Sequence, residues 1–299
     1  MATPAIVRDY KPADREHILD LDRASKGGHE GAYGNTHEEL VLALTNAGQI
    51  KPENVLVAAE WGRIAGYGIV VPEPPLRRAV IDFLTREEHA GTAVEESLLA
   101  GTVQRAVGRA VEMAHVNVAE HRQATRGLLK RLGFREVRTY LELACPAREA
   151  GRGDPPGDYR RLEPGEEGTL AELQNSAFAG CWGYSPISAE DVTRRLALGD
   201  CSHQDILLLP VHGSPVAYCW TTLRTEARGR IHMIGVAPSQ QGRGLGRKVL
   251  ELGLWHVRQR RATRVEVTVD SENRAARALY ERAGFQAYLT TLWYERKLR

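Results

Sequence analysis

The sequence has few cysteines, and their spacing suits neither a metal site nor a set of disulfides. The 299 residues contain four of them, namely Cys145, Cys181, Cys201 and Cys219. No Cys-x-x-Cys pair and no Cys/His ligand spacing occurs, which excludes the common zinc motifs and a small disulfide-stapled domain. We therefore expect free thiols in a reducing compartment and no bound metal.

Long apolar runs and a surplus of charge are also missing. No stretch reaches the ~18 apolar residues of a membrane-spanning helix, and the N-terminal residues are too polar for a secretory signal. Forty Lys and Arg against 38 Asp and Glu leave a formal net charge of +2, too little for a surface dedicated to nucleic acid. These absences predict a cytoplasmic protein without a membrane or nucleic-acid partner. The arginine-rich stretch from Arg258 to Arg264 leaves nucleic-acid binding open as an alternative.

The chain is long enough for two hydrophobic cores, and its composition indicates where they divide. A length of 299 residues with 42% hydrophobic and 26% charged residues is typical of a globular protein with two domains of ~150 residues each. The segment CPAREAGRGDPPGDY, residues 145–159, replaces any apolar period with Pro, Gly and charge. We predict domains at residues 1–146 and 158–299, joined by a linker at residues 147–157.

The two halves resemble each other. RQATRGLLKRLGFREVRTYLEL, residues 122–143, aligns without a gap with NRAARALYERAGFQAYLTTLWY, residues 273–294. In the second half, residues 205–226 predict a hairpin, residues 230–238 a third strand, and residues 264–270 a strictly alternating strand. The predicted fold is α/β: two tandem copies of a mixed, mostly antiparallel sheet with helices on both faces.

A glycine-rich turn precedes the longest apolar helix of the second half. QQGRGLGRKVLELGLWHV, residues 240–257, places Gly242, Gly244 and Gly246 at alternate positions. A strand that ends in such a turn offers N–H groups at a helix N-terminus, where the helix dipole favours an anion and glycine lets a ligand approach the main chain. We expect a phosphate site, with a plain glycine turn as the alternative. The Walker and dinucleotide motifs do not fit, because Arg247 and Lys248 stand where they require other residues.

Two segments together resemble the GNAT acetyltransferase superfamily. VAPSQQGRGLG, residues 236–246, is similar to the acyl-CoA pyrophosphate loop of that family, (Gln/Arg)-x-x-Gly-x-(Gly/Ala), and DSENRAARALYERAGF, residues 270–285, is similar to its second signature. The repeat extends the fold to a degenerate N-terminal GNAT-like domain, a tandem layout similar to that of members that acetylate a cysteinyl sugar conjugate.

The resemblance implies an N-acetyltransferase with its active site in the C-terminal domain. It would transfer an acetyl group from acetyl-CoA to a primary amine of a small-molecule or peptide acceptor, by direct attack in a ternary complex. Acetylation of a cysteinyl sugar conjugate and non-catalytic acyl-CoA binding with a regulatory role remain as alternatives. Acyl chain length and oligomeric state are not predicted.

The resemblance also implies which residues bind acetyl-CoA. They are Ile234, Val236, Gln241, Gly242, Arg243, Gly244, Leu245, Gly246, Arg247 and Asn273. Tyr280 lies seven residues after Asn273 on one helix face. We predict that it is the general acid, because a phenol with a reference pKa of ~10 keeps its proton at neutral pH and can give it to a leaving thiolate.

The general base departs from the family pattern. Many members place Glu six residues before the equivalent of Val236, where this chain has Arg230. His232, expected on the same strand face as Val236, is the nearest titratable substitute, with a reference pKa of ~6.5. Glu226, Glu266 or a chain of waters remain open, and Arg230 is a candidate for holding an anionic substrate group.

The first half has lost both signatures. Alignment of residues 86–99 with residues 238–251 puts Thr92 at Gly244 and Val94 at Gly246, while Arg122 and Leu129 replace Asn273 and Tyr280. β-branched side chains cover a main chain that glycine would expose. We expect a structural or substrate-shaping domain, although Gly91 leaves weak cofactor binding open.

The acceptor site is predicted in the loop FAGCWGYSPISAED, residues 178–191. Trp182 and Tyr184 are expected to line it, because aromatic side chains in a loop between elements often form a ligand wall. Hydrophobic tethering of the loop is the alternative. Ser188 and Asp191 form a capping-box pattern that ends the loop and starts a helix.

Overall fold

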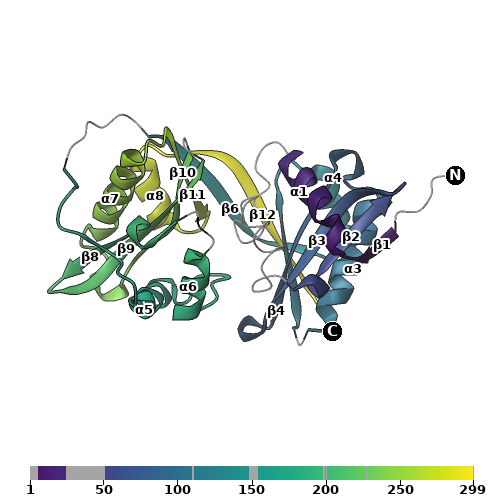
Figure 1. Ribbon diagram of the computed structural model, residues 1–299, viewed down its shortest axis with the longest axis horizontal. Coiled ribbons are helices and arrows are strands. Elements are labelled where there is room, and N and C mark those ends of the chain that lie inside the picture. The colour runs from purple at the N-terminus through teal and green to yellow at the C-terminus, as the bar shows by residue number, and fades with distance from the viewer. Residues whose placement is uncertain are drawn as a thin grey trace. The chain divides into compact units, whose positions relative to one another are not determined.

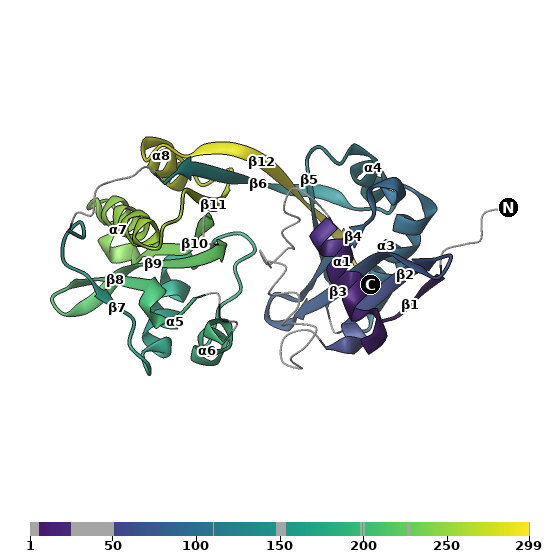
Figure 2. The ribbon, with the colours of Figure 1, turned by 45° about the horizontal axis from the view of Figure 1, so that its top comes forward.

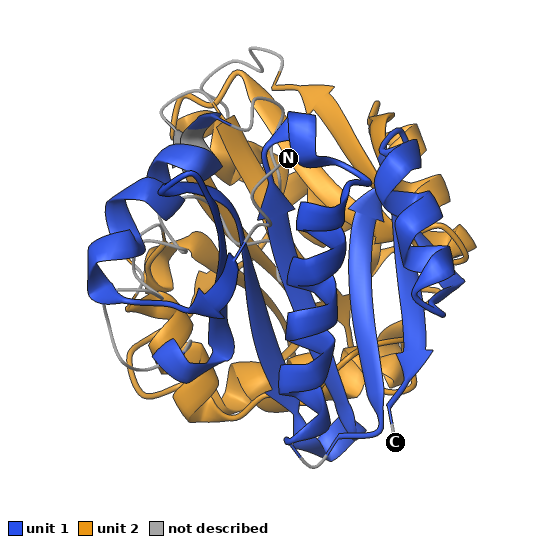
Figure 3. Cartoon of the chain, turned by 90° about the vertical axis from the view of Figure 1, so that its right-hand side faces the viewer, with its two compact units in different colours: residues 1–140, 290–299 blue, residues 141–289 orange. Residues whose placement is uncertain are grey.

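The computed structural model describes residues 6–24, 51–109, 111–147, 154–197, 199, 201–225 and 228–298. Its contacts divide the chain into two compact units (Figure 3). Unit 1 comprises Met1–Tyr140 and Thr290–Arg299, and unit 2 comprises Leu141–Leu289. None of the helices in the described segments is long and apolar enough to cross a membrane.

In unit 1 the neighbouring strands follow the order β1-β2-β3-β4-β5-β12. Its elements are β1 (Ile6–Asp9), α1 (Arg15–Ala24), β2 (Val55–Glu60), β3 (Arg63–Glu73), β4 (Arg78–Thr85), α3 (Ala93–Val107), β5 (Met113–Ala119), α4 (Gln123–Arg131) and the end of β12 (Gln286–Lys297). Only β4 and β5 pair in parallel. Ile18 of α1 packs on one face with Val57, and Leu99 of α3 packs on the other with Ile81.

Unit 2 repeats this plan with strand order β6-β11-β10-β9-β8-β7 (Figures 1 and 2). Its elements are the end of β6 (Arg135–Pro146), β7 (Arg160–Arg161), α5 (Glu167–Phe178), α6 (Ala189–Leu196), β8 (Ile206–Val211), β9 (Ser214–Thr225), β10 (Arg228–Val236), α7 (Leu245–Gln259), β11 (Arg264–Asp270) and α8 (Arg274–Arg282). Alternate residues of β9 point to opposite faces of the sheet and pack in two different hydrophobic cores. Tyr218 packs with Leu170 of α5, and Cys219 packs with Leu250 of α7. We call these faces the α5 side and the α7 side.

The last strand of each repeat begins in its own compact unit and ends in the other one: β6 enters unit 2 at Leu141, and β12 enters unit 1 at Thr290. β12 follows α8 in the chain, yet its residues Thr291 to Lys297 pair with β5 of unit 1. β6 follows α4, yet it is the neighbour of β11 in unit 2. The boundaries of the compact units therefore reflect this exchange of strands. The predicted domains, residues 1–146 and 158–299, reflect the sequence repeat instead, and their different roles stay a prediction.

The local predictions for unit 2 are confirmed. The hairpin, the third strand and the alternating strand appear as β8, β9, β10 and β11, and Ser188 accepts a 3.2 Å hydrogen bond from the N–H of Asp191 at the start of α6. α7 lies close on β9, since a Cβ on Gly253 would come within 2.3 Å of the Cys219 sulfur. Cys219 is fully buried as a small core residue.

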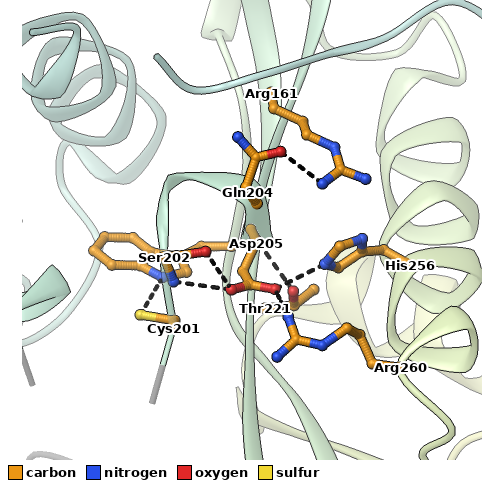
Figure 4. A network of polar contacts seen from close by, with 9 residues as sticks. Arg161, Cys201, Ser202, Gln204, Asp205, Thr221, His256 and Arg260 are labelled. Atoms are coloured by element: carbon orange, nitrogen blue, oxygen red, sulfur yellow. Dashed lines mark hydrogen bonds and ion pairs between the residues drawn. The ribbon is translucent and has the colours of Figure 1, made fainter. Parts of the chain in front are cut away.

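A buried polar network fixes the C-terminal end of α7 (Figure 4). Asp205 ends a short 3-10 helix, His203–Asp205, before β8. Its carboxylate accepts hydrogen bonds from Ser202 Oγ at 2.9 Å, from His256 Nε2 at 2.9 Å, and from Arg260. Burial alone would raise the pKa of Asp205, but the hydrogen bonds from His256 and Ser202 and the charge of Arg260 outweigh it and lower that pKa.

Candidate active site

The parallel strands β10 and β11 separate partway along their length. Their pairing ends at Ile231 opposite Val267, although β10 continues to Val236 and β11 to Asp270. On its other edge β10 stays paired with β9 through Val236. Among the described residues, the last part of β10 therefore has no strand partner on the β11 side, so the main-chain N–H groups of Ile234 and Val236 there have no ladder partner in β11 and are open to a ligand or water. We call residues 232–236 with residues 268–270 the β10–β11 divergence.

A β-bulge lies at the base of this divergence. Ile231 pairs with Thr221 and Met233 with Trp220, so His232 is an extra residue on β10. The His232 and Trp220 rings meet edge-on with centroids 5.2 Å apart, and Trp220 belongs to the core of the α5 side. Val236 packs on the α7 side. The expectation that His232 shares a face with Val236 is therefore wrong, because the bulge interrupts the alternation.

Arg230 lies on the α5 side and is held by two residues that the sequence analysis missed. Its Nη2 donates a 2.5 Å hydrogen bond to Thr268 Oγ1, and its Nη1 lies 3.6 Å from Glu142 Oε2. Thr268 Oγ1 donates to Glu142 Oε1 at 2.7 Å. Glu142 belongs to β6, and its sequence carries no signal that β6 lies beside β11.

The carboxylate of Glu266, also considered as the base, is held by two arginines. Glu266 has no exposed surface and accepts hydrogen bonds from Arg228 at 2.6 Å and Arg264 at 2.9 Å. Such a pairing holds a carboxylate in place in a buried sheet. Glu226 lies outside the described residues.

The glycine-rich turn leads from β10 through a 3-10 helix, Pro238–Gln240, into α7. Gly242 and Gly244 have φ angles of +76° and +77°, a conformation that favours glycine. A Cβ at either would find nothing within 4 Å, so the surface above the turn is open. Gly246 lies within the first turn of α7, where a Cβ would make ordinary contact with Leu279 at 3.7 Å.

The N-terminus of α7 has the properties of an anion site. Its N-cap, Gly244, provides no side-chain hydrogen bond, and the first turn holds no acidic residue. The helix dipole and the unbonded N–H groups therefore favour a bound negative charge. Arg243 is exposed beside them, whereas Arg247 is paired with Glu251 at 2.7 Å. Gln241 is turned back, since its Nε2 donates to Val236 O at 3.1 Å.

Tyr280 lies on the α7 side, across the sheet from His232 and Arg230. It is 3% exposed and meets Phe285 edge-on at 5.6 Å. Within the described part of the chain, its hydroxyl makes no hydrogen bond. Burial raises the pKa of Tyr280 above its ordinary value. Asn273 is the exposed N-cap of α8 and accepts a 3.0 Å hydrogen bond from Ala276 N–H.

The α5–α6 connection is tied down by its own side chains. Tyr184 stacks on Phe178 with centroids 5.3 Å apart, and its hydroxyl donates to Asn175 Oδ1 at 2.7 Å. Asn175 Oδ1 also accepts from Ile187 N–H at 2.9 Å. Tethering, the alternative role, is thus confirmed for Tyr184. Trp182 is half-buried in the same connection, and an acceptor-lining role for either residue stays a prediction.

Unit 1 retains the strand divergence but lacks the rest of the site. Its β4 and β5 stop pairing at Ile81 opposite Val116, but the register between β3 and β4 has no bulge. The turn before α3 is occupied by Glu95, which has no exposed surface and accepts a 2.6 Å hydrogen bond from Gly91 N–H. The turn at the N-terminus of α3 is thus hydrogen-bonded to a carboxylate of its own chain, whereas the equivalent N-terminus of α7 in unit 2 has no acidic residue in its first turn.

Comparison with known proteins identifies the class and then the family. Residues 169–285 match the acetyltransferase (GNAT) family. The mycothiol acetyltransferase of Beutenbergia cavernae is 31% identical over 265 residues, covering 83% of this chain and 84% of that protein. That of Thermomonospora curvata is 29% identical and covers 86% of each chain.

The fold agrees with that assignment. A GCN5-related N-acetyltransferase from Sphaerobacter thermophilus has a TM-score of 0.76 at 20% identity and covers 100% of this chain and 97% of its own. The protein is therefore an acyltransferase enzyme, built from two GNAT-like units. The chain belongs to the GNAT acetyltransferase family, whose members use acetyl-CoA as the acyl donor.

Proposed function

We propose that unit 2 transfers the acetyl group of acetyl-CoA to a primary amine, at the β10–β11 divergence. The observation that carries this proposal is the uncapped, acid-free N-terminus of α7 immediately after the part of β10 that has no partner in β11. A linear ligand with phosphates at one end and amide groups along its length matches this arrangement. Both its anionic end and its amides would find main-chain partners.

The residues present fit such a ligand. The main chain at Gly242 and Gly244 is open to a diphosphate, with Arg243 exposed beside it. The main-chain groups of Ile234 and the N–H of Val236 on the open edge of β10 are suited to the amides of the pantetheine arm, whereas the Val236 carbonyl already accepts from Gln241. The cap position of Asn273 leaves its side-chain NH₂ group available at the start of α8.

The chemistry needs an oxyanion donor, an acid and a base. When bound, acetyl-CoA supplies a thioester carbon that an amine can attack. N–H groups at the open edge of β10 would donate to the thioester oxygen, a role worth about 3 kcal/mol in other enzymes. Tyr280 would donate its hydroxyl proton to the leaving sulfur. Because burial raises the pKa of Tyr280, the proton stays on the phenol at neutral pH, and the same desolvation makes an adjacent thiolate a stronger base.

His232 is the base that this site favours. The bulge turns its imidazole to the α5 side, the side of the α5–α6 connection and of Arg230. A base there would take the proton of the incoming amine on the face opposite Tyr280, so that proton removal and proton donation stay separate. No protein nucleophile is required, because the amine attacks directly.

For the acceptor, the relatives favour a cysteinyl amino-sugar conjugate over an unrelated amine. Two relatives named mycothiol acetyltransferase match at 29% and 31% identity and over more than four-fifths of this chain. Desacetyl-mycothiol, which carries a free cysteinyl amine, is accordingly the first acceptor to test.

The test is a calorimetric titration followed by an assay. The full chain is titrated with acetyl-CoA and with CoA, and is then incubated with acetyl-CoA and desacetyl-mycothiol while products are followed by mass. We expect that both acetyl-CoA and CoA bind and that an acetylated product forms. Absence of binding would overturn the site. Binding without this product, but with acetylation of another primary amine, would overturn only the acceptor.

A further inference from the structure

Three polar side chains from adjacent strands meet on the α5 side at the base of the β10–β11 divergence. They are Glu142 of β6, Thr268 of β11 and Arg230 of β10, with Thr268 Oγ1 2.7 Å from Glu142 Oε1 and 2.5 Å from Arg230 Nη2. Glu142 is 6% exposed and Arg230 is 8% exposed. Burying a charged side chain costs free energy unless a charge of opposite sign lies beside it, so Glu142 and Arg230 act as an ion pair.

The fold itself does not require this cluster. In unit 1, β4 and β5 pair in the same register, and the equivalent positions are held by Val80, Asn117 and Trp293. The same sheet therefore forms with an apolar residue in place of Arg230 and an aromatic residue in place of Glu142. Among the described residues, an arginine–glutamate pair at these positions occurs only in the unit that also keeps the open α7 N-terminus, which points to a role in the site.

The position of the cluster indicates which ligand group it meets. The anion site lies at the far end of the divergence, at α7, so the reactive end of the donor would point toward the base, beside His232 and Arg230. An amine acceptor must approach there, and a primary amine is mostly protonated at neutral pH. A guanidinium alone would repel that cation.

We propose that Glu142 is a specificity-determining residue of the acceptor site: its carboxylate balances the guanidinium of Arg230 and lets a cationic primary amine enter the α5 side of the divergence. This inference rests on the proposed function. Besides Glu142 and Arg230, the charged or titratable side chains on that face of β10 and β11 include Arg228, His232, Arg264, Glu266 and Asp270. Glu266 is already matched by Arg228 and Arg264.

The decisive variant is Glu142→Gln, assayed with acetyl-CoA and desacetyl-mycothiol. Removing the carboxylate makes the charge around Arg230 more positive by one, and we expect the acceptor KM to rise about tenfold or more, with the calorimetric Kd for acetyl-CoA unchanged within about twofold. The penalty should shrink as pH rises toward the pKa of the amine, because the neutral amine is not repelled. A purely structural role would not produce that pH dependence.

A double variant and a control complete the test. The double variant Arg230→Met/Glu142→Gln removes both charges together and should bring the acceptor KM back down toward the wild-type value, which also keeps the test available if the single Glu142 variant fails to fold. Asp205→Asn, a buried carboxylate beside an arginine on the α7 side, should lower stability without raising the acceptor KM.

The outcomes separate the two proposals. A wild-type chain that acetylates no primary amine overturns the proposed function and this assignment with it. A wild-type chain that turns over while Glu142→Gln keeps the wild-type KM overturns only the assignment. The same result follows if the double variant keeps a raised KM, or if the rise does not change with pH.

Discussion

The N–H of Gly91 donates a 2.6 Å hydrogen bond to Oε2 of Glu95, a carboxylate with no exposed surface. Glu95 Oε1 also accepts hydroxyl hydrogen bonds from Thr85 at 3.0 Å and Thr125 at 3.1 Å. One side chain thus joins the end of β4, the turn before α3 and the first turn of α4. In unit 2 the corresponding space lies at the predicted cofactor site.

This internal carboxylate predicts a single acetyl-CoA site per chain. A diphosphate cannot share the α3 N-terminus with a buried carboxylate, since the two negative charges would repel each other. Calorimetric titration of the full chain should give a stoichiometry of one. Glu95→Gln should still give one, while lowering the free energy of unfolding by about 1–3 kcal/mol. A second site of similar affinity in the wild-type chain would contradict this account.

Gly244→Val tests the open turn. Its φ of +77° disfavours a β-branched residue by about 1–3 kcal/mol, and the side chain would cover the main chain at the anion site. We expect at least about a tenfold loss of acetyl-CoA affinity by calorimetry. Gly213→Val is the matched control, because Gly213 has φ +83° and equally open surroundings in the β8–β9 turn. It should cost similar stability and leave the affinity unchanged.

Tyr280→Phe tests the acid. Removing the hydroxyl should lower kcat by roughly 10²-fold or more and leave the Kd for acetyl-CoA unchanged. Since burial raises the pKa of Tyr280, the wild-type enzyme should show no loss of activity from ionisation of this phenol below about pH 10. Tyr294→Phe, in the core of unit 1, is the control and should keep kcat. An unchanged kcat in Tyr280→Phe would remove the acid assignment.

Much of the fold follows from local pattern. Residues 264–270 alternate strictly and form β11, and the ungapped repeat matches α4 with α8 and β6 with β12. The glycine turn is likewise visible, because positive φ angles at Gly242 and Gly244 leave a local mark on the sequence. In each case one short segment contains all the information that its structure requires.

The features that could not be predicted from the sequence depend on contacts between residues far apart in the chain. The exchange of β6 and β12 could not be anticipated, since both strands have the same apolar pattern, and so the meeting of Glu142 with Arg230 was missed. The bulge at His232 did leave a signal: Ile231, Ile234 and Val236 are spaced by three and then two residues, which a regular strand does not allow. Glu95 looked like an ordinary helix residue until its three donors were known.

Asp205→Asn tests the network that fixes the end of α7. The pKa of Asp205 is lowered in the folded protein, so its carboxylate adds stability above the unfolded pKa of ~3.9, and this stability is lost as pH falls through the folded pKa. We expect the variant to lower the free energy of unfolding by about 3 kcal/mol at pH 7, because it leaves His256 and Arg260 without their shared charge.

Urea unfolding at pH 7 and at about pH 3 measures that difference, which should narrow at the lower pH because the Asp205 carboxylate of the unfolded wild-type chain gains a proton there. Asp191→Asn is the control, because Asp191 accepts the same pair of hydrogen bonds from Ser188 but its side chain is 42% exposed. It should cost no more than about 1 kcal/mol. An equal cost at both positions would mean that the capping geometry, and not the buried pairing with α7, is what stabilises this end of the helix.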